Sequence, residues 1–121
     1  MSKERKYDLE DRLIDYAVRI IKLSEALPPT KAPRHVSNQI LRRSGTCAAP
    51  NYGEAQSAES KADFIHKLKI ALKELRETKI WLKIIVKAKM IEPTSPLDSI
   101  LQETTELIAI IFTSLKTAEE R

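Results

Sequence analysis

The side chains best suited to chemistry in this 121-residue chain are cationic, and they gather between residues 60 and 90. Five of them recur along one side of the helix that this stretch predicts, and we call them the basic strip: Lys69, Lys73, Arg76, Lys83 and Lys87. Each pair of like charges four residues apart costs an isolated helix about 0.2–0.5 kcal/mol. A row of basic side chains on a rigid helix can neutralise nucleic-acid phosphates. We therefore predict a nucleic-acid site here, assisted by Arg42 and Arg43 from the preceding helix.

Two other interpretations of the basic strip remain open from the sequence. Lysines most often lie on a solvated face that binds nothing. The strip could also form ion pairs with the acidic end of the chain, because residues 92–121 carry six acidic and only two basic side chains. The net charge of +4 permits a nucleic-acid partner without requiring one.

The remaining reactive residue types do not form a catalytic or metal-binding pattern. His35 and His66 have no carboxylate or cysteine at the spacing of metal ligands, and the sequence has no glycine-rich phosphate loop. Cys47 lies among small residues with no basic side chain placed to ionise it, so we expect a structural thiol. We therefore expect no metal, no cofactor and no catalytic residues, and we predict that the protein is not an enzyme.

A second set of apolar residues lies on the 60–90 helix away from its buried side: Ile70, Ile80, Trp81 and Ile84. A helical bundle buries one side of each helix, so these residues would be exposed in a monomer. Exposed apolar patches usually mark an interface, and we predict an oligomer interface here. Ile14, Val18 and Ile21 likewise lie beside the main apolar stripe of the first helix, which we also expect to be buried on two sides.

The apolar periodicity predicts an all-α fold, an antiparallel up-and-down four-helix bundle that occupies residues 1–121 as one domain. The helices are expected at about 8–27, 33–57, 60–89 and 96–116. The third helix shows a heptad seam that should face the core: Phe64, Leu68, Ala71, Leu75, Thr78, Leu82 and Ile85. Ser60 and Asp63 have the spacing of a helix capping box.

A kink is expected near residue 50 in the second helix. Pro50 lacks a backbone N–H and would clash with the carbonyl group four residues earlier. Asn51 and Glu54 follow it closely, and we expect them to satisfy the backbone groups that the kink releases.

The composition also predicts where the protein works. The sequence has no run of 18 apolar residues and no apolar signal-peptide segment, so no membrane partner is expected. A single cysteine excludes an intrachain disulfide framework and is typical of a reducing compartment, which predicts a cytoplasmic location.

Several short segments, taken together with their order, carry a family resemblance. They are LRRSGT at 41–46, NYGEA at 51–55, ADF at 62–64, KLKIALKE at 67–74, ET at 77–78 and WL at 81–82. The series resembles the bacterial four-helix-bundle proteins encoded by intervening sequences within 23S rRNA genes. It is also similar in fold to the accessory variability determinants of diversity-generating retroelements. Pro50 and Cys47 depart from the pattern, and Pro50 puts the continuity of the second helix in doubt.

The resemblance implies a ring-shaped homopentamer with a basic surface suited to nucleic acid, and it implies no catalytic residues. Two functions of different class follow. The first is a non-enzymatic, oligomeric protein that binds structured RNA or DNA, either associated with rRNA or accessory to a reverse transcriptase. The alternative is a homo-oligomeric assembly or protein-interaction module that binds no nucleic acid.

Overall fold

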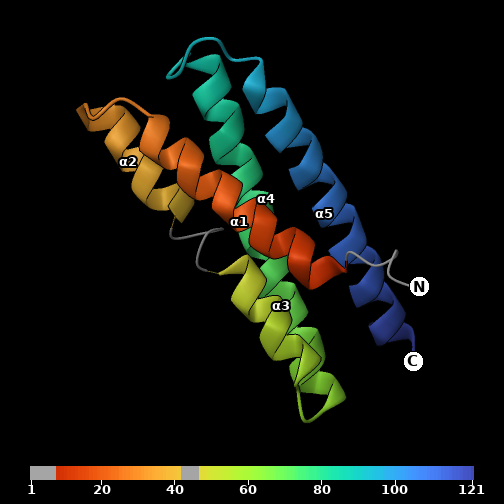
Figure 1. Ribbon diagram of the computed structural model, residues 1–121. Helices are drawn as coiled ribbons and strands as arrows, with labels where there is room; N and C mark the ends of the chain where they lie inside the picture. The colour runs from red at the N-terminus through yellow and green to blue at the C-terminus, as the bar shows by residue number, and fades with distance from the viewer. Residues whose placement is uncertain (1–7, 42–46) are drawn as a thin grey trace.

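The chain is all-α in the computed structural model, which describes residues 8–41 and 47–121 (Figure 1). Within these ranges it forms five helices and no strand: α1 (Leu9–Ala26), α2 (Lys31–Ile40), α3 (Ala48–Gln56), α4 (Lys61–Lys87) and α5 (Pro96–Glu120). The all-α prediction is confirmed, but a bundle of four helices is not. In place of one helix over 33–57, α2 and α3 follow one another along the same side of the molecule.

The break in the expected second helix lies upstream of Pro50, which corrects the predicted kink. Pro50 is the third residue of α3, within the first turn, where no helical acceptor is available for its missing N–H. The backbone N–H of Asn51 donates to the carbonyl oxygen of Cys47 over 3.0 Å, and its Nδ2 donates to the same oxygen over 2.7 Å. Asn51 therefore places two hydrogen bonds on one carbonyl oxygen at the start of α3, rather than bonding a group released by a kink at Pro50. Glu54 instead pairs with Lys67 of α4 over 2.7 Å.

The other helix ends follow local capping rules. The Asp8 side chain accepts from the backbone N–H of Asp11 over 2.9 Å and caps α1. The Ser60 hydroxyl accepts from the backbone N–H of Asp63 over 3.0 Å, which confirms the predicted cap of α4. Pro96 occupies the first turn of α5, where its fixed φ suits a helix start. That helix continues to Glu120, four residues beyond the predicted end.

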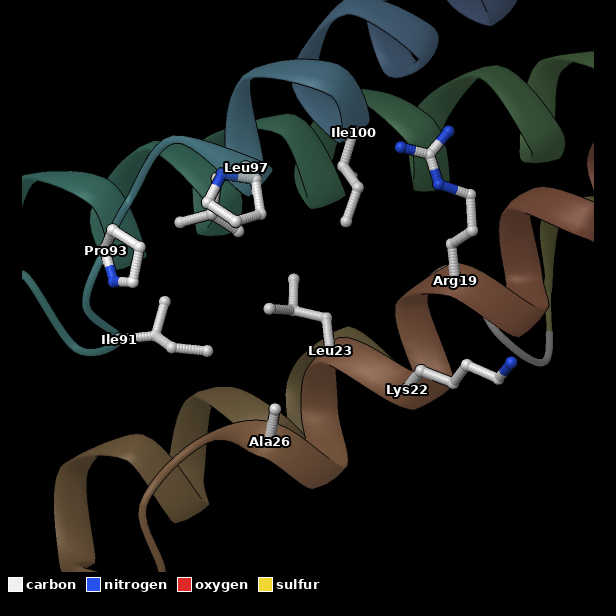
Figure 2. A pocket seen from close by; sticks show the side chains of 9 residues that line it. Arg19, Lys22, Leu23, Ala26, Ile91, Pro93, Leu97 and Ile100 are labelled. Atoms are coloured by element: carbon white, nitrogen blue, oxygen red, sulfur yellow. The ribbon is translucent and has the colours of Figure 1, made fainter.

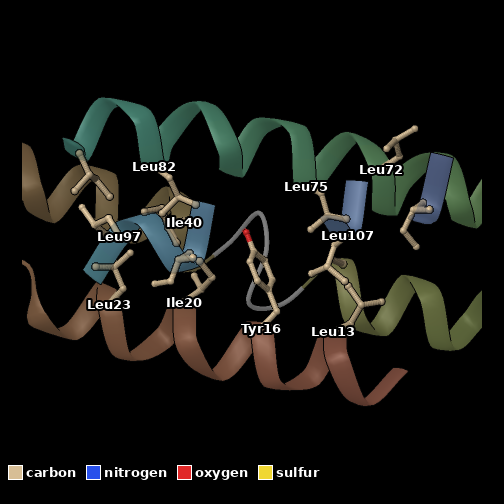
Figure 3. Packing of buried hydrophobic residues seen from close by; sticks show 14 of the residues in the cluster. Leu13, Tyr16, Ile20, Leu23, Ile40, Leu72, Leu75, Leu82, Leu97 and Leu107 are labelled. Carbon is tan, nitrogen blue, oxygen red and sulfur yellow. The ribbon is translucent and has the colours of Figure 1, made fainter. Parts of the chain in front are cut away.

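Helices surround the core on four sides, with α2 and α3 together forming one side. α4 and α5 form a long antiparallel pair, and α2 and α3 lie between α1 and α4 (Figure 1). α1 and α4 each pack against α2, α3 and α5. In the described ranges they do not pack directly against each other. These two helices therefore occupy opposite corners of the bundle. Figure 3 shows their side chains pointing toward one another across the core.

The core contains the heptad seam that the sequence predicts. Leu68, Ala71, Leu75, Thr78, Leu82 and Ile85 are all buried, and Phe64 packs at the edge of the cluster. α1 supplies Leu13, Tyr16, Ile20 and Leu23 from the opposite side (Figure 3). No helix in the described residues is long and apolar enough to span a membrane.

One polar pair crosses this core. The hydroxyl groups of Tyr16 and Thr104 lie 2.7 Å apart, and Thr104 Oγ1 also donates to the carbonyl oxygen of Ile100 over 2.7 Å. Because the Thr104 proton is used in the second bond, Tyr16 must be the donor in the first. Burial raises the pKa of Tyr16 to about 12, which keeps this donor protonated.

Candidate interaction surface on helix α4

The outer side of α4 brings together two sets of residues that the sequence analysis treated separately. We call this surface the α4 outer face, and it consists of Lys73, Ile80, Lys83, Ile84 and Lys87, all of which are exposed. Ile80 remains 57% exposed and Ile84 37% exposed. Lys73, Ile80 and Lys87 are seven residues apart, so they lie on nearly the same line along the helix. Ile80, Lys83, Ile84 and Lys87 line one shallow groove on this face. The predicted nucleic-acid site and the predicted oligomer interface therefore share one surface.

The other two predicted interface residues, Ile70 and Trp81, are partly covered within the subunit. Ile70 and Trp81 are both half-buried. The Trp81 ring meets the ring of His35 on α2 edge to face, with centroids 5.9 Å apart and an interplanar angle of 73°. Trp81 thus connects α2 to α4, and its remaining exposed edge continues the apolar surface of Ile80 and Ile84 in a second groove.

Two members of the basic strip interact with α5. Lys69 Nζ lies 3.6 Å from a carboxylate oxygen of Glu119, and the Arg76 guanidinium lies 5.8 Å from the centre of the Phe112 ring. Lys73, Lys83 and Lys87 make no ion pair with any residue in 8–41 or 47–121. Arg42 and Arg43 lie outside the described residues. The strip is therefore divided between contacts within the subunit and cations that are available to a partner.

The acidic side chains of α5 mainly serve α1 rather than α4. Arg12 donates to Glu103 over 2.7 and 3.1 Å and to Glu106 over 3.1 Å. The pKa of Glu106 is lowered by its hydrogen bond from Gln102 and by the Arg12 guanidinium. The interpretation in which α5 forms ion pairs along the basic strip therefore holds for Lys69 but not for the α4 outer face.

A second exposed apolar stripe runs along α1, and we call it the α1 stripe. It consists of Ile14, Val18 and Ile21, which remain 45%, 44% and 37% exposed. The sequence predicts a second buried side for α1, but the single subunit leaves this side uncovered. Exposed carboxylates stand beyond both of its ends, Asp11 before Ile14 and Glu25 after Ile21. The pKa of Asp11 is raised, chiefly because the negative charge of Asp8 lies close by at the start of this helix.

A separate cavity of about 370 Å³ lies between α1, the α4–α5 connection and the start of α5 (Figure 2). Its walls are largely apolar and include Leu23, Ile91 and Leu97. Arg19 and Lys22 stand at one end, and Arg19 Nη2 donates to the Ser99 hydroxyl over 2.8 Å. Within the ranges that the structure covers, no group of His, Cys, Asp and Glu side chains is placed to hold a metal ion. The cavity is therefore an apolar hollow with a basic rim.

Comparisons with known proteins agree with the fold. A family model described as 23S rRNA-intervening sequence protein matches residues 5–113. A crystal structure of a protein with unknown function from the S23 ribosomal protein family of Bacteroides thetaiotaomicron VPI-5482 is 36% identical in sequence. The similarity covers 90% of this chain and 99% of that one, with a TM-score of 0.81. A search of curated proteins finds no match.

Proposed function

The chain belongs to the 23S rRNA-intervening sequence protein family, and from this premise we propose that it is a non-enzymatic homo-oligomer that assembles through the α4 outer face. The observation that carries the proposal is the exposure of Ile80 and Ile84, next to the half-buried Trp81, on the longest helix. Apolar side chains clustered in this way usually mark an interaction site. Assembly is therefore the function that the geometry supports best.

The subunit number belongs to the proposal as well. The family resemblance implies a closed ring of five subunits, and a ring requires two different surfaces on each subunit. Substituting Trp81 with Lys places a charge beside Ile80 and Ile84, so Trp81→Lys should lower the mass of the assembled protein in sedimentation. Lys31→Glu on α2 is a matched exposed control, because Lys31 lies outside both the α4 outer face and the α1 stripe.

A second candidate function, binding of structured RNA or DNA, is favoured by a different observation. Lys73, Lys83 and Lys87 point away from the core on a rigid helix of 27 residues and make no ion pair within the described residues. Such cations can contact phosphates without reading sequence. Membership in a family named for an rRNA intervening sequence supports RNA in particular. Binding should then weaken with salt, with a slope of about −0.7 to −0.9 per phosphate neutralised.

The two functions compete for the same surface. Ile80 lies between Lys73 and Lys87 on the helix, so covering the isoleucine with another subunit also covers the neighbouring lysines. The pair Lys73→Glu and Lys83→Glu, measured by fluorescence anisotropy with labelled RNA and DNA, tests the nucleic-acid function. If the doubly reversed protein binds as tightly as the wild type in low salt, the α4 outer face is not the nucleic-acid site. If the wild type shows no binding in about 50 mM salt, assembly alone remains, because phosphate contacts are strongest at low salt.

A reverse transcriptase as a protein partner stays a prediction that depends on the similarity to retroelement accessory proteins. A basic oligomer could bring such an enzyme to its RNA template by binding both. Co-purification of the two proteins after nuclease treatment would test the direct contact, since an interaction bridged only by nucleic acid would be lost.

A further inference from the structure

We propose that the α4 outer face of one subunit packs antiparallel against the α1 stripe of a second copy of this chain. This inference rests on the proposed assembly and names the surface that completes it. The two surfaces are the main uncovered apolar stretches of the described chain, since Phe112, which is also exposed, lies beneath Arg76. They lie on α1 and α4, which occupy opposite corners of the bundle. One subunit cannot join them, whereas neighbouring subunits can.

The charges of the two surfaces are complementary. The α1 stripe has a carboxylate beyond each end, at Asp11 and Glu25, whereas the α4 outer face has an ammonium group toward each end, at Lys73 and Lys87. Within the described ranges none of these four side chains takes part in an ion pair. Opposite charges at the rim of an apolar contact steer association and disfavour the pairing of like surfaces. Two α1 stripes, or two α4 outer faces, would bring like charges together.

The spacing of the charges also matches. Asp11 and Glu25 are 14 residues apart and centred on Val18, and Lys73 and Lys87 are 14 residues apart and centred on Ile80. On a helix each separation spans about 21 Å and returns to nearly the same side. When Val18 is placed over Ile80, each of the two carboxylates therefore lies opposite one of the two ammonium groups.

The antiparallel direction is favoured by the apolar residues. In that direction Ile14, four residues before Val18, comes level with Ile84, four residues after Ile80. Asp11 then faces Lys87, and Glu25 faces Lys73. In the parallel direction Ile14 would instead meet Arg76, which already lies over Phe112. The contact joins two different surfaces, so each of the two subunits keeps its other surface free for a further neighbour, as a ring requires.

Zero-length carbodiimide cross-linking of the wild-type chain tests this pairing directly. An equal mixture of isotopically light and heavy protein, digested and read by mass spectrometry, distinguishes links between copies from links within one copy. We expect light–heavy amide links between Asp11 and Lys87 and between Glu25 and Lys73. Links of Asp11 to Lys73 would overturn the antiparallel direction, and the absence of any link between α1 and α4 in an assembled protein would overturn the pairing.

A charge exchange provides a second test. Lys73→Glu combined with Lys87→Glu should reduce the assembled species at least tenfold, and adding Asp11→Lys and Glu25→Lys should restore it. Circular dichroism checks that each variant folds. If the fourfold variant stays dissociated while the wild type assembles, the pairing is wrong and assembly through the α4 outer face still stands. If the wild type is monomeric, the proposed function fails, and the pairing fails with it.

Discussion

Truncation of Ile80 gives a quantitative test of the α4 outer face. Complete burial of an isoleucine side chain is worth about 1.5–3 kcal/mol, and Ile80 is 57% exposed in the subunit, so covering it contributes roughly 1–2 kcal/mol to each contact. Ile80→Ala should remove most of this contribution and weaken each contact roughly five- to tenfold. A subunit that leaves a closed ring breaks two contacts. The substitution therefore lowers the free energy that holds one subunit in the ring by about twice its effect on a single contact.

Sedimentation velocity over a concentration series measures this effect, and thermal unfolding supplies the comparison. Ile80 is exposed and alanine favours helix, so the stability of the single subunit should change by less than about 0.5 kcal/mol. Phe112→Ala is the matched control, because Phe112 is 43% exposed but lies outside both surfaces. Unchanged assembly of Ile80→Ala, or equal weakening by Phe112→Ala, would refute the assignment of the interface.

Three further predictions concern the subunit itself. Tyr16→Phe should lower the free energy of unfolding by about 0.5–1.5 kcal/mol in denaturant titrations, because it removes the buried bond to Thr104. An unchanged stability would contradict that role. Because the pKa of Tyr16 is about 12 in the folded chain and 10.0 ordinarily, its contribution is complete below pH 10 and should be lost between pH 10 and 12. The same pH series on Tyr16→Phe should show a shallower decline, and identical slopes would count against the shift. Ser60→Ala should cost about 1 kcal/mol, whereas Ser95→Ala should cost little, because the Ser60 side chain makes a cap bond and the Ser95 side chain makes none. Equal losses in urea melts would argue against the cap.

The helical class and the core of α4 could be predicted because local and tertiary preferences agree there. The heptad seam repeats over seven positions, and a helix with one such side has one way to face a core. The Ser60 cap depends only on residues three positions apart, so it too is visible in the sequence. These features require no knowledge of which helices are neighbours.

The break between α2 and α3 could not be placed from the sequence. A proline fits either at a kink inside a helix or in the first turn of a new one, and Pro50 takes the second position. Ion pairs between residues far apart in the sequence could not be predicted either. Arg12 meets Glu103 from 91 residues away, and nothing local selects this acid over the others on α5.

The sequence contains all the residues of the α4 outer face, but the sequence analysis assigned its lysines to a nucleic-acid site and its isoleucines to an oligomer interface. Lys73, Ile80 and Lys87 have heptad spacing, which places them on one line, although their chemistry invites separate interpretations. The structure adds which of these side chains remain exposed. It also adds that α1 and α4 occupy opposite corners of the bundle, which only the tertiary arrangement decides.

The most direct test of the central claim is the mass of the wild-type protein in sedimentation equilibrium at several tens of micromolar. The subunit mass is 13.8 kDa. Assembly through the α4 outer face predicts a discrete multiple of this mass, and the family resemblance predicts a fivefold one. A species of 13.8 kDa throughout the concentration range would contradict the account.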